Sequence, residues 1–295
     1  MNWDKLRIFH AVAEAGSLTR AGDQLHLSQS AVSRQITALE ESLGVSLFHR
    51  HARGLILTEQ GEHLFKTVHE IFAKIEMTEA QLRDSKQTPR GDLRVTTTVA
   101  FGSTWLTRRI GEFIERYPEI KVHIIVADHE LDIGMREADC AIRFHPPQQP
   151  HLIQRQLVVA HYHIYGSRRY LERHGAPATA SDLDDHALIV YGPGAPAPLR
   201  NVNWIIKAGP THRLREPVLR INNIYGILNA VESGVGLAAL PDYLVRGRPD
   251  LVRVLPDLEG PNFVTYFVYP EELRDSVRIG VFRDFLISKV GKTDL

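Results

Sequence analysis

The sequence predicts a multidomain fold, with a mainly helical N-terminal part, then one long helix, then an α/β part. Three observations predict this order. Apolar residues recur at helical spacing over residues 4–43, and the same kind of spacing runs along residues 59–86. From residue 93 onward, strand-like and helix-like patterns alternate, which is typical of an α/β domain. A chain of 295 residues is also too long for one ordinary hydrophobic core.

The composition is that of a folded globular protein, because apolar residues make up 43% and charged residues 24% of the chain. No apolar run approaches the roughly 18 to 20 residues that span a bilayer, and residues 1–7 carry charges where a secretion signal needs an apolar segment. We therefore expect a cytoplasmic protein that makes no membrane contact. The single cysteine, Cys140, excludes an internal disulfide, and we interpret it as a buried packing residue, with redox sensing as the alternative.

Three short helices are expected first. The first covers residues 4–15 and ends at Gly16, where a C-terminal glycine is usual. The second covers residues 18–25 behind the N-cap Ser17, and the third runs from the N-cap Ser28 to residue 43. The short turn between the second and third helices predicts a helix-turn-helix.

The outward face of the third helix is the informative one. It combines amide, guanidinium and hydroxyl groups near the helix N-terminus, the part of a recognition helix that meets base edges in the major groove. For an isolated helix, a merely solvated polar face would be the simpler interpretation. The side chains expected to contact DNA from this helix are Ser28, Gln29, Ser30, Ser33, Arg34 and Thr37.

The segment after the third helix favours the DNA-binding interpretation. Residues 47–58 are predicted to form two short strands around a basic turn, a wing whose Arg50 and Arg53 would contact phosphate or the minor groove. Charge alone is uninformative, because the net charge of the chain is zero and residues 1–58 hold six basic against five acidic side chains.

A spaced pattern of residues covers the whole N-terminal part. It resembles the DNA-binding signature of LysR-type transcriptional regulators, with departures at Gly22 and Ser30, where that family often has alanine and proline. The matching residues are Leu6-x-x-Phe9, Ala15-Gly16-Ser17, Ser28-Gln29-Ser30-Ala31-Val32-Ser33-x-Gln35-Ile36, Leu39-Glu40-x-x-Leu43-Gly44, Leu47-Phe48-x-Arg50 and Leu57-Thr58-x-x-Gly61.

The resemblance implies a sequence-specific regulator that binds double-stranded operator DNA and responds to a small-molecule effector, without any cofactor. It also implies a homodimer, with dimers pairing into a homotetramer, and contact with RNA polymerase if the protein is an activator. The identity of the effector, the target genes and the choice between activation and repression are left open.

The long helix is predicted to be a coiled-coil linker that pairs two chains. Its apolar residues follow four-three spacing, although a helix packed on its own domain is the alternative. The resemblance agrees, because linker helices of the family pair two chains. The expected dimerisation residues are Leu64, Val68, Ile71, Ile75 and Leu82.

We divide the chain into a winged helix-turn-helix at residues 1–58, the linker helix at 59–87, a hinge at 88–92 and an effector domain at 93–295. A parallel sheet is expected in the last of these. The expected strands are 93–98, 122–126, 140–144, 158–165, 187–191, 219–221, 237–241 and 263–269, and the expected helices are 103–117, 131–137, 224–233 and 276–288.

In the family, the effector domain resembles periplasmic binding proteins, with two α/β subdomains joined by crossing strands around a ligand cleft. The resemblance implies a subdomain I at about 93–161 and 266–295, and a subdomain II at about 162–265. A cleft between two α/β halves is also where a ligand is expected on physical grounds.

Candidate effector contacts lie at the ends of predicted strands. The turn after the first strand opens a helix, whose free N–H groups favour a small polar or acidic ligand, and the family uses this turn for effectors. Plain helix capping is the alternative for its hydroxyl and for the asparagines. The expected contacts are Thr98, Ala100, Phe101, Ser103, Arg143, Phe144, Asn222 and Asn223.

Two other classes of protein, an enzyme and a transport binding component, agree less well with the sequence. An enzyme would need a catalytic set in the cleft, but the sequence has no Gly-x-Ser-x-Gly, phosphate-binding loop or HExxH motif. A transport binding component would need an export signal. We expect no metal site, because His161-x-His163 has no third ligand placed by its spacing.

Overall fold

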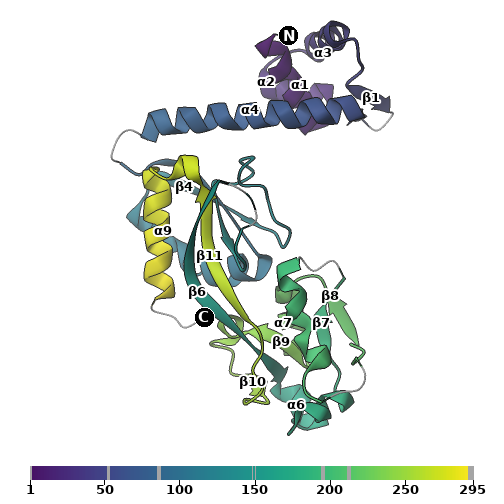
Figure 1. The fold of residues 1–295 in the computed structure, drawn as a ribbon, viewed down its shortest axis with the longest axis vertical. Helices are drawn as coiled ribbons and strands as arrows, with labels where there is room; N and C mark the ends of the chain where they lie inside the picture. Colours follow the sequence, from purple (N-terminus) through teal and green to yellow (C-terminus); the bar gives the residue numbers. More distant parts are fainter. Residues whose placement is uncertain are drawn as a thin grey trace. The chain divides into compact units, whose positions relative to one another are not determined.

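The structure is a computed structural model that describes residues 2–51, 54–84, 88–147, 149, 151–193, 197–210 and 214–291. The chain divides into two compact units, Met1–Leu82 and Arg83–Leu295 (Figure 1). Each unit is described by itself.

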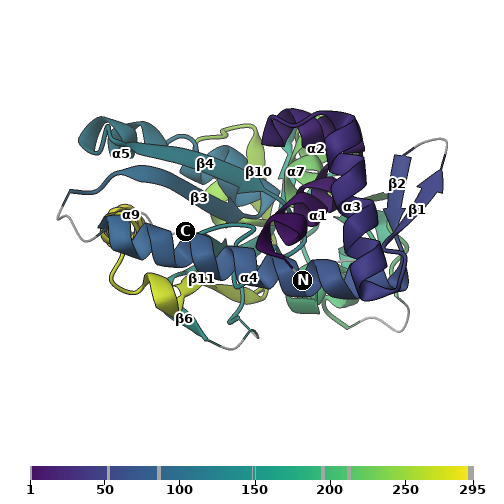
Figure 2. The same cartoon turned by 90° about the horizontal axis from the view of Figure 1, so that it is seen from above.

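The first unit is a winged helix-turn-helix followed by a long helix (Figure 2). Both predicted N-caps are confirmed, because Ser17 and Ser28 each accept a hydrogen bond from a backbone N–H three residues later. Gly16 and Gly44 end their helices in the left-handed conformation. The elements are α1 (Trp3–Ala15), α2 (Leu18–Leu25), α3 (Gln29–Leu43), β1 (Phe48–His51), β2 (Gly54–Leu57) and α4 (Glu59–Asp84).

One hydrophobic core holds this unit together. The stripe Leu6, Phe9 and Val12 of α1 packs with Ile36 and Leu39 of α3, and all five side chains are buried. Burying each of them contributes about 1.5 to 3 kcal/mol relative to leaving it exposed. The three short helices therefore present α3 on a fixed frame.

The wing is attached to this frame by Glu40 and Thr58. The Glu40 carboxylate accepts the backbone N–H groups of Leu47 (2.7 Å) and Phe48 (3.3 Å). Thr58 donates its hydroxyl to the Ser46 carbonyl (2.8 Å) and caps α4 by accepting the Gly61 N–H (3.0 Å). These contacts explain physically why Glu40, Leu47, Phe48, Thr58 and Gly61 occur together in the N-terminal sequence pattern.

Two glycines of this unit are required by close backbone approach. A Cβ atom on Gly61 would lie 2.1 Å from the Leu47 carbonyl oxygen, and one on Gly22 would lie 2.6 Å from the Leu27 carbonyl oxygen. Gly22, the departure from the more usual alanine, thus allows the tight turn between α2 and α3.

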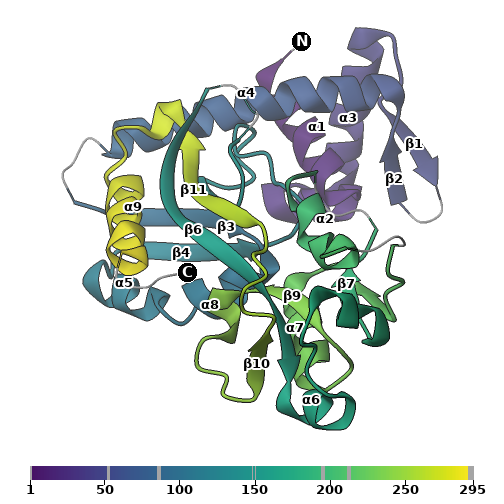
Figure 3. The same cartoon turned by 60° about the horizontal axis from the view of Figure 1, so that its bottom comes forward.

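The second unit contains two α/β lobes (Figure 3). In lobe I, the strands lie in the order β4-β3-β5-β11-β6, and α9 packs on β3 and β6. Its elements are β3 (Gly91–Thr97), η1 (Phe101–Leu106), α5 (Ile110–Arg116), β4 (Ile120–Val126), β5 (Cys140–Arg143), β6 (Leu152–Ser167), β11 (Asn262–Pro270), η4 (Glu271–Leu273) and α9 (Val277–Val290).

Lobe II continues the same sheet through the second half of β6. There β6 pairs with β9 on one side and β10 on the other, while β7 and β8 form a short parallel pair beside β9. Its elements are α6 (Arg168–His174), η2 (Ala180–Asp185), β7 (Ile189–Tyr191), η3 (Ala197–Lys207), β8 (Leu219–Ile221), α7 (Ile224–Glu232), β9 (Ala238–Pro241), α8 (Asp242–Val245) and β10 (Leu251–Val254).

Strand β6 belongs to both lobes, as Figure 1 shows. Its first part pairs with β11 as far as His161, which lies opposite Asn262, and from Tyr162 it pairs with β9. The ladder between β6 and β11 is irregular between Thr265 and Tyr266. The connection between the lobes is therefore a continuous strand with an antiparallel neighbour.

The prediction of a parallel sheet is only partly correct. Strand β3 is parallel to β4 and β5, but β11 is antiparallel to both β5 and β6. The sheet is mixed because β6 and β11 cross between the lobes in opposite directions. The periodicity of a strand does not reveal the direction of its neighbour.

Two predicted helices of lobe I are wrong in detail. The expected helix 103–117 is split into the π-helix η1 and the α-helix α5, with a turn at 107–109 between them. Residues 131–137 form a turn, because Asp132 accepts the Met135 N–H and Arg136 adopts a positive φ of 60°. Local hydrogen bonds of this kind compete with helix formation.

Cys140 is fully buried in the central strand β5. Burial raises the pKa of its thiol well above the ordinary value, which disfavours the reactive thiolate. The packing interpretation accounts for this environment. Separately, in the described part of the chain, no helix has both the length and the apolar character needed to cross a membrane.

Candidate DNA interface and ligand cleft

The polar face of α3 is open to solvent. Gln29, Ser30, Arg34 and Thr37 are exposed, together with the N-cap Ser28, whereas Ser33 is half-buried. The opposite stripe of the helix is buried in the core, so this orientation is fixed by packing. The structure thus places the six predicted positions between the N-cap and the middle of α3.

These side chains differ in what they already contact. Ser28 caps α3 at the Ala31 N–H (3.2 Å), and its hydroxyl lies 3.1 Å from that of Ser30. Among the described residues, Gln29 and Arg34 have no hydrogen-bond or ion-pair partner. Their donors are available to an external partner without loss of an internal bond.

The wing consists of β1 and β2, paired antiparallel from Phe48–Leu57 to His51–Gly54. Two arginines, Arg50 and Arg53, are predicted to contact DNA from the wing. Arg53 lies outside the described residues, and so does the side chain of Arg50. Ile56, on β2, is exposed.

The predicted seam of α4 is split between two environments. Val68 is 1% exposed to solvent and belongs to the helix-turn-helix core, and Leu64 packs against that core. Val68 therefore has no surface with which to contact a second chain, and the alternative of a helix packed on its own domain holds for this part of α4. Ile71 and Ile75 are exposed, and the Leu82 side chain lies outside the described residues.

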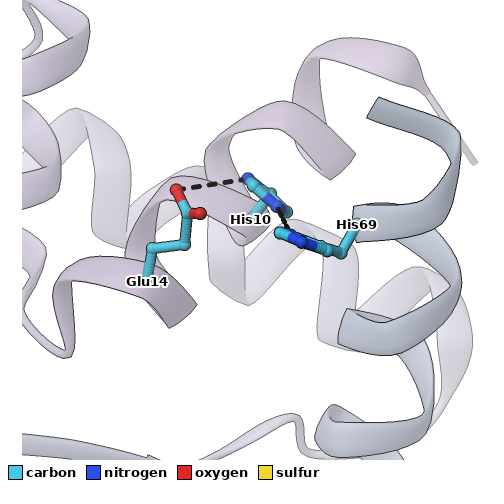
Figure 4. A group of neighbouring side chains, drawn as sticks. All are labelled: His10, Glu14 and His69. Carbon is cyan, nitrogen blue, oxygen red and sulfur yellow. Dashed lines mark hydrogen bonds and ion pairs between the residues drawn. The ribbon is translucent and has the colours of Figure 1, made fainter. Parts of the chain in front are cut away.

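A polar and aromatic cluster joins α1 to α4 (Figure 4). His10 Nε2 lies 2.8 Å from His69 Nδ1, and His10 Nδ1 lies 3.6 Å from a Glu14 carboxylate oxygen. The His10 ring also stacks on Phe65 and packs against Phe72. In the described ranges, this is the one group of three potential metal ligands lying close together. Hydrogen bonding and ring packing account for its arrangement.

The second unit contains a pocket of about 330 Å³ between its lobes. Lobe I lines it with Val99 and Asp128, and lobe II lines it with Tyr191, Asn222 and Asn223. The lobe I residues follow β3 and β4, and Tyr191 ends β7, so the pocket lies at the carboxyl ends of parallel strands. Two smaller hollows adjoin it and share Asp128.

Asp128 is the central polar residue of this pocket. Its carboxylate accepts the Val99 N–H (3.0 Å) and a hydrogen bond from the Tyr191 hydroxyl. Burial raises the pKa of Asp128, and burial together with the Asp128 charge raises the pKa of Tyr191 to about 12. Neither residue is among the predicted contacts, although Asp128 follows β4, where ligand-binding residues are expected.

The turn after β3 contributes fewer contacts than predicted. Thr98 and Ala100 line the hollows that adjoin the pocket, but Phe101 is fully buried against Trp105. Ser103 is exposed and lines none of the pockets found in the described part. A π-helix, with i to i+5 spacing, has more residues per turn than an α-helix, so each residue rotates less about the axis and Ser103 lies at a different angle than an α-helix would give it.

Arg143 is not free to meet an anion. It is 5% exposed, donates to the Leu131 carbonyl (2.8 Å) and lies 3.3 Å from the Glu130 carboxylate. Phe144, also predicted, is buried beside Phe101. Asp128 already accepts the Val99 N–H, so this N–H of the turn is not available to a ligand.

The two asparagines lie in the pocket as predicted, but in different states. Asn223 caps α7 by accepting the Gly226 N–H (2.6 Å), so the capping alternative applies to it. The exposed side chain of Asn222 forms no hydrogen bond to the part of the protein that the structure describes. The predicted pair His161 and His163 contact Asn262 and Asp242, respectively, at 2.8 and 2.7 Å.

Comparison with known proteins identifies this architecture. Residues 3–62 match the family described as "Bacterial regulatory helix-turn-helix protein, lysR family", and residues 86–291 match the "LysR substrate binding domain". The chain belongs to the LysR family. Members of this family are transcriptional regulators and not enzymes; they bind operator DNA in the cytoplasm and form oligomers.

Individual LysR-type relatives match over nearly the full length. The regulator PgrR of Escherichia coli is 32% identical, with 95% of each chain covered, and CrgA of Neisseria meningitidis is 30% identical, with 98% of this chain and 97% of CrgA covered. The solved structure of CrgA has a TM-score of 0.63 at 27% identity over 99% of both chains. That of AphB, a virulence activator of Vibrio cholerae, has 0.65 at 25% identity over 100% of both.

Proposed function

We propose that this LysR-type regulator reads its operator with the polar face of α3 and responds to a polar effector bound between the lobes of its second unit. The observation that carries the proposal is the pocket of about 330 Å³, which both lobes line at the carboxyl ends of parallel strands. A ligand there can change the arrangement of the lobes, because it contacts both.

We propose the following division of the chain. The winged helix-turn-helix covers residues 1–58, the linker helix 59–87, the hinge 88–92 and the effector domain 93–295. Matches to the family over 3–62 and 86–291 support this division. For the effector domain, the pairing of His161 with Asn262 supports a crossing near residue 161 and a return that begins near 262.

Base readout is assigned to α3 and phosphate contact to the wing. The assignment is supported by the exposure of Gln29 and Arg34 and by the absence of partners for them in the described residues. Amide and guanidinium groups make bidentate contacts to adenine and guanine, and hydroxyls such as that of Thr37 bind either bases or phosphate. Arg50 and Arg53 are assigned to phosphate or the minor groove.

The effector is expected to carry hydrogen-bond donors rather than an unpaired negative charge. The Asp128 carboxylate is the main acceptor in the pocket, and the nearby guanidinium of Arg143 is paired with Glu130. An acidic ligand would therefore meet the Asp128 carboxylate, and His129 is the one basic side chain among the residues found to line this pocket. Asn222 adds an amide that can both donate and accept.

Pairing of two chains is assigned to the outer part of α4. Ile71 and Ile75 support this, because both expose about two fifths of their surface on one helix at four-residue spacing. A dimer presents two recognition helices to a two-fold symmetric operator. A homotetramer, and contact with RNA polymerase in the case of an activator, extend the same proposal.

The effector proposal is tested by blocking the pocket. Asn222→Trp places a large ring at the mouth of the pocket, whereas Asn229→Trp places the same ring on the exposed face of α7, away from it. Footprinting on the promoter beside the protein's own gene, with a panel of metabolites, identifies a response. We expect Asn222→Trp to abolish the response and retain operator binding, and Asn229→Trp to respond normally. A normal response from Asn222→Trp would exclude this pocket.

A further inference from the structure

A second pocket, of about 400 Å³, shares no residue with the 330 Å³ pocket. It lies where η1 and the turn after it pack against α8. Lobe I contributes Arg108 and Arg109 to its wall, and lobe II contributes Arg246 and Arg248. We call it the arginine pocket.

Two of its arginines are held in place by the protein. The Arg109 guanidinium stacks 4.5 Å from the centre of the Trp105 ring and donates to the Trp105 carbonyl (3.1 Å). Arg248 donates to the Leu244 carbonyl (2.9 Å) and forms an ion pair with Glu232. A ligand would therefore meet donors whose rotamer entropy has already been lost.

The charge of the pocket is poorly compensated. Arg108 and Arg246 are exposed, and neither has a carboxylate partner among the residues that the structure describes. Two nearby carboxylates are engaged, since Glu232 pairs with Arg248 and Glu112 pairs with Lys289. Burial is the main reason why the pKa of Arg109 is lowered; the charges of Arg108 and Arg246 lower it further, and Glu112 opposes them.

We propose that the arginine pocket binds a small phosphate-bearing anion, which bridges guanidinium groups of the two lobes. The planar fork of arginine matches the oxygens of a phosphate group, and each such bond is charge-assisted. Because this pocket and the cleft share no residue, the anion and the polar effector bind at separate sites. An anion that spans the lobes favours the lobe arrangement seen here.

The test is isothermal titration of the full chain with pyrophosphate, at ionic strength kept constant with NaCl. We expect saturable binding of one pyrophosphate per chain. Parallel titrations with orthophosphate and with glucose 6-phosphate distinguish an inorganic from an organic source of the phosphate. Trp105 lines the pocket, so binding should also change tryptophan fluorescence, and Trp105→Phe should lose that signal.

Matched variants assign the binding to this pocket. Arg108→Gln and Arg246→Gln should each weaken pyrophosphate by about tenfold, the size expected for one charge-assisted hydrogen bond. Arg155→Gln in lobe I and Arg220→Gln in lobe II remove exposed arginines elsewhere and should leave affinity within about twofold of the unaltered chain. Arg246→Lys keeps the positive charge but loses the planar guanidinium, so its pyrophosphate affinity should lie between those of the unaltered chain and Arg246→Gln.

Three results would overturn the proposal. The first is the absence of saturable binding by any of the three phosphate compounds. The second is an equal loss in the control and pocket variants, which would indicate general charge attraction. The third is weaker operator binding by Arg108→Gln and Arg246→Gln with unchanged pyrophosphate affinity, which would assign these arginines to DNA. Circular dichroism of every variant shows that folding is retained.

Discussion

The charged groups of the recognition helix and of the ligand pocket differ in whether the protein itself pairs them. On α3, Gln29 and Arg34 have no partner in the described part of the chain. In the pocket, Asp128 is bonded to Val99 and Tyr191, and Arg143 nearby is paired with Glu130. A surface made for a rigid, charged partner can keep its donors in water, but a partly buried pocket has to satisfy them internally.

The difference indicates whether removing a side chain lowers the free energy of DNA binding or the free energy of unfolding. On α3, truncation removes a contact to DNA and leaves the folded protein unchanged. In the pocket, truncation leaves a partner unpaired in a partly buried place, so the fold loses stability first. The four predictions below test this contrast, in order of decreasing expected effect.

Salt should separate the two regions most strongly. If two copies make about six phosphate contacts, operator affinity should fall about a thousandfold between 50 and 200 mM salt, because bound counterions are released. The unfolding midpoint of the second unit should hardly change over this range. Gel-shift titration and urea unfolding measure the two quantities, and an operator affinity independent of salt would contradict the assignment of phosphate contacts.

Removing the buried arginine should cost stability. Arg143→Ala removes the donor to the Leu131 carbonyl and leaves the Glu130 carboxylate with His145 alone, and we expect a loss of about 3 kcal/mol in the unfolding free energy of the second unit. Arg155→Ala, at an exposed position of β6, serves as the control and should change it by less than about 0.5 kcal/mol. Urea unfolding measures both, and equal effects would remove the contrast between exposed and paired arginines.

Removing the exposed arginine of α3 should cost specificity. Arg34→Ala should weaken operator binding by about 1 to 3 kcal/mol, the range for a lost base contact, and weaken binding to random DNA much less. Arg7→Ala, on the exposed face of α1, is the matched control. The urea midpoint should stay unchanged in both. Equal losses on operator and random DNA would move base readout away from Arg34.

The smallest effect is a pH dependence at Asp128. Burial raises the pKa of this carboxyl in the folded state, so the stability linked to it is complete below the ordinary carboxyl pKa of about 4 and is lost as the pH rises through the folded-state pKa. Asp128→Asn cannot ionise. Its unfolding free energy relative to the unaltered chain should therefore increase from pH 4 to pH 7.

Urea unfolding at several pH values measures this difference, and Asp257→Asn, at an exposed carboxyl, is the control that should show no trend. A difference that stays constant with pH would mean that Asp128 ionises as easily in the folded chain as in the unfolded one.

The first unit could be predicted closely because its signals are local. Ser17, Ser28, Gly16 and Gly44 mark helix ends through contacts within a few residues, and each one is confirmed. For the part of α4 that packs on the core, the sequence favoured pairing of two chains over packing on its own domain, because four-three spacing describes a buried face without saying what buries it. Val68 is the example, since it packs against its own domain.

The pocket could be predicted only in part because it is assembled from distant segments. Asn222 was found from its place before a helix, whereas Asp128 and Tyr191 are 63 residues apart and meet only through the crossing strands. The π-helix η1, on which Ser103 is exposed, has no distinctive periodicity in a segment of six residues. Arginines 108 and 246 likewise meet only in the folded chain.

Strand β6 is long enough for a small bend within it to move both lobes. Its 16 residues span about 50 Å, with the change of partner from β11 to β9 near the middle. About 30 Å of the strand lies on one side of this change and about 18 Å on the other, so a bend of about 10° there displaces the two ends by about 5 and about 3 Å. A ligand that alters only a few contacts beside this point thereby moves the far ends of the lobes by about the size of an atom. Such a strand needs no large hinge, because its length provides the amplification.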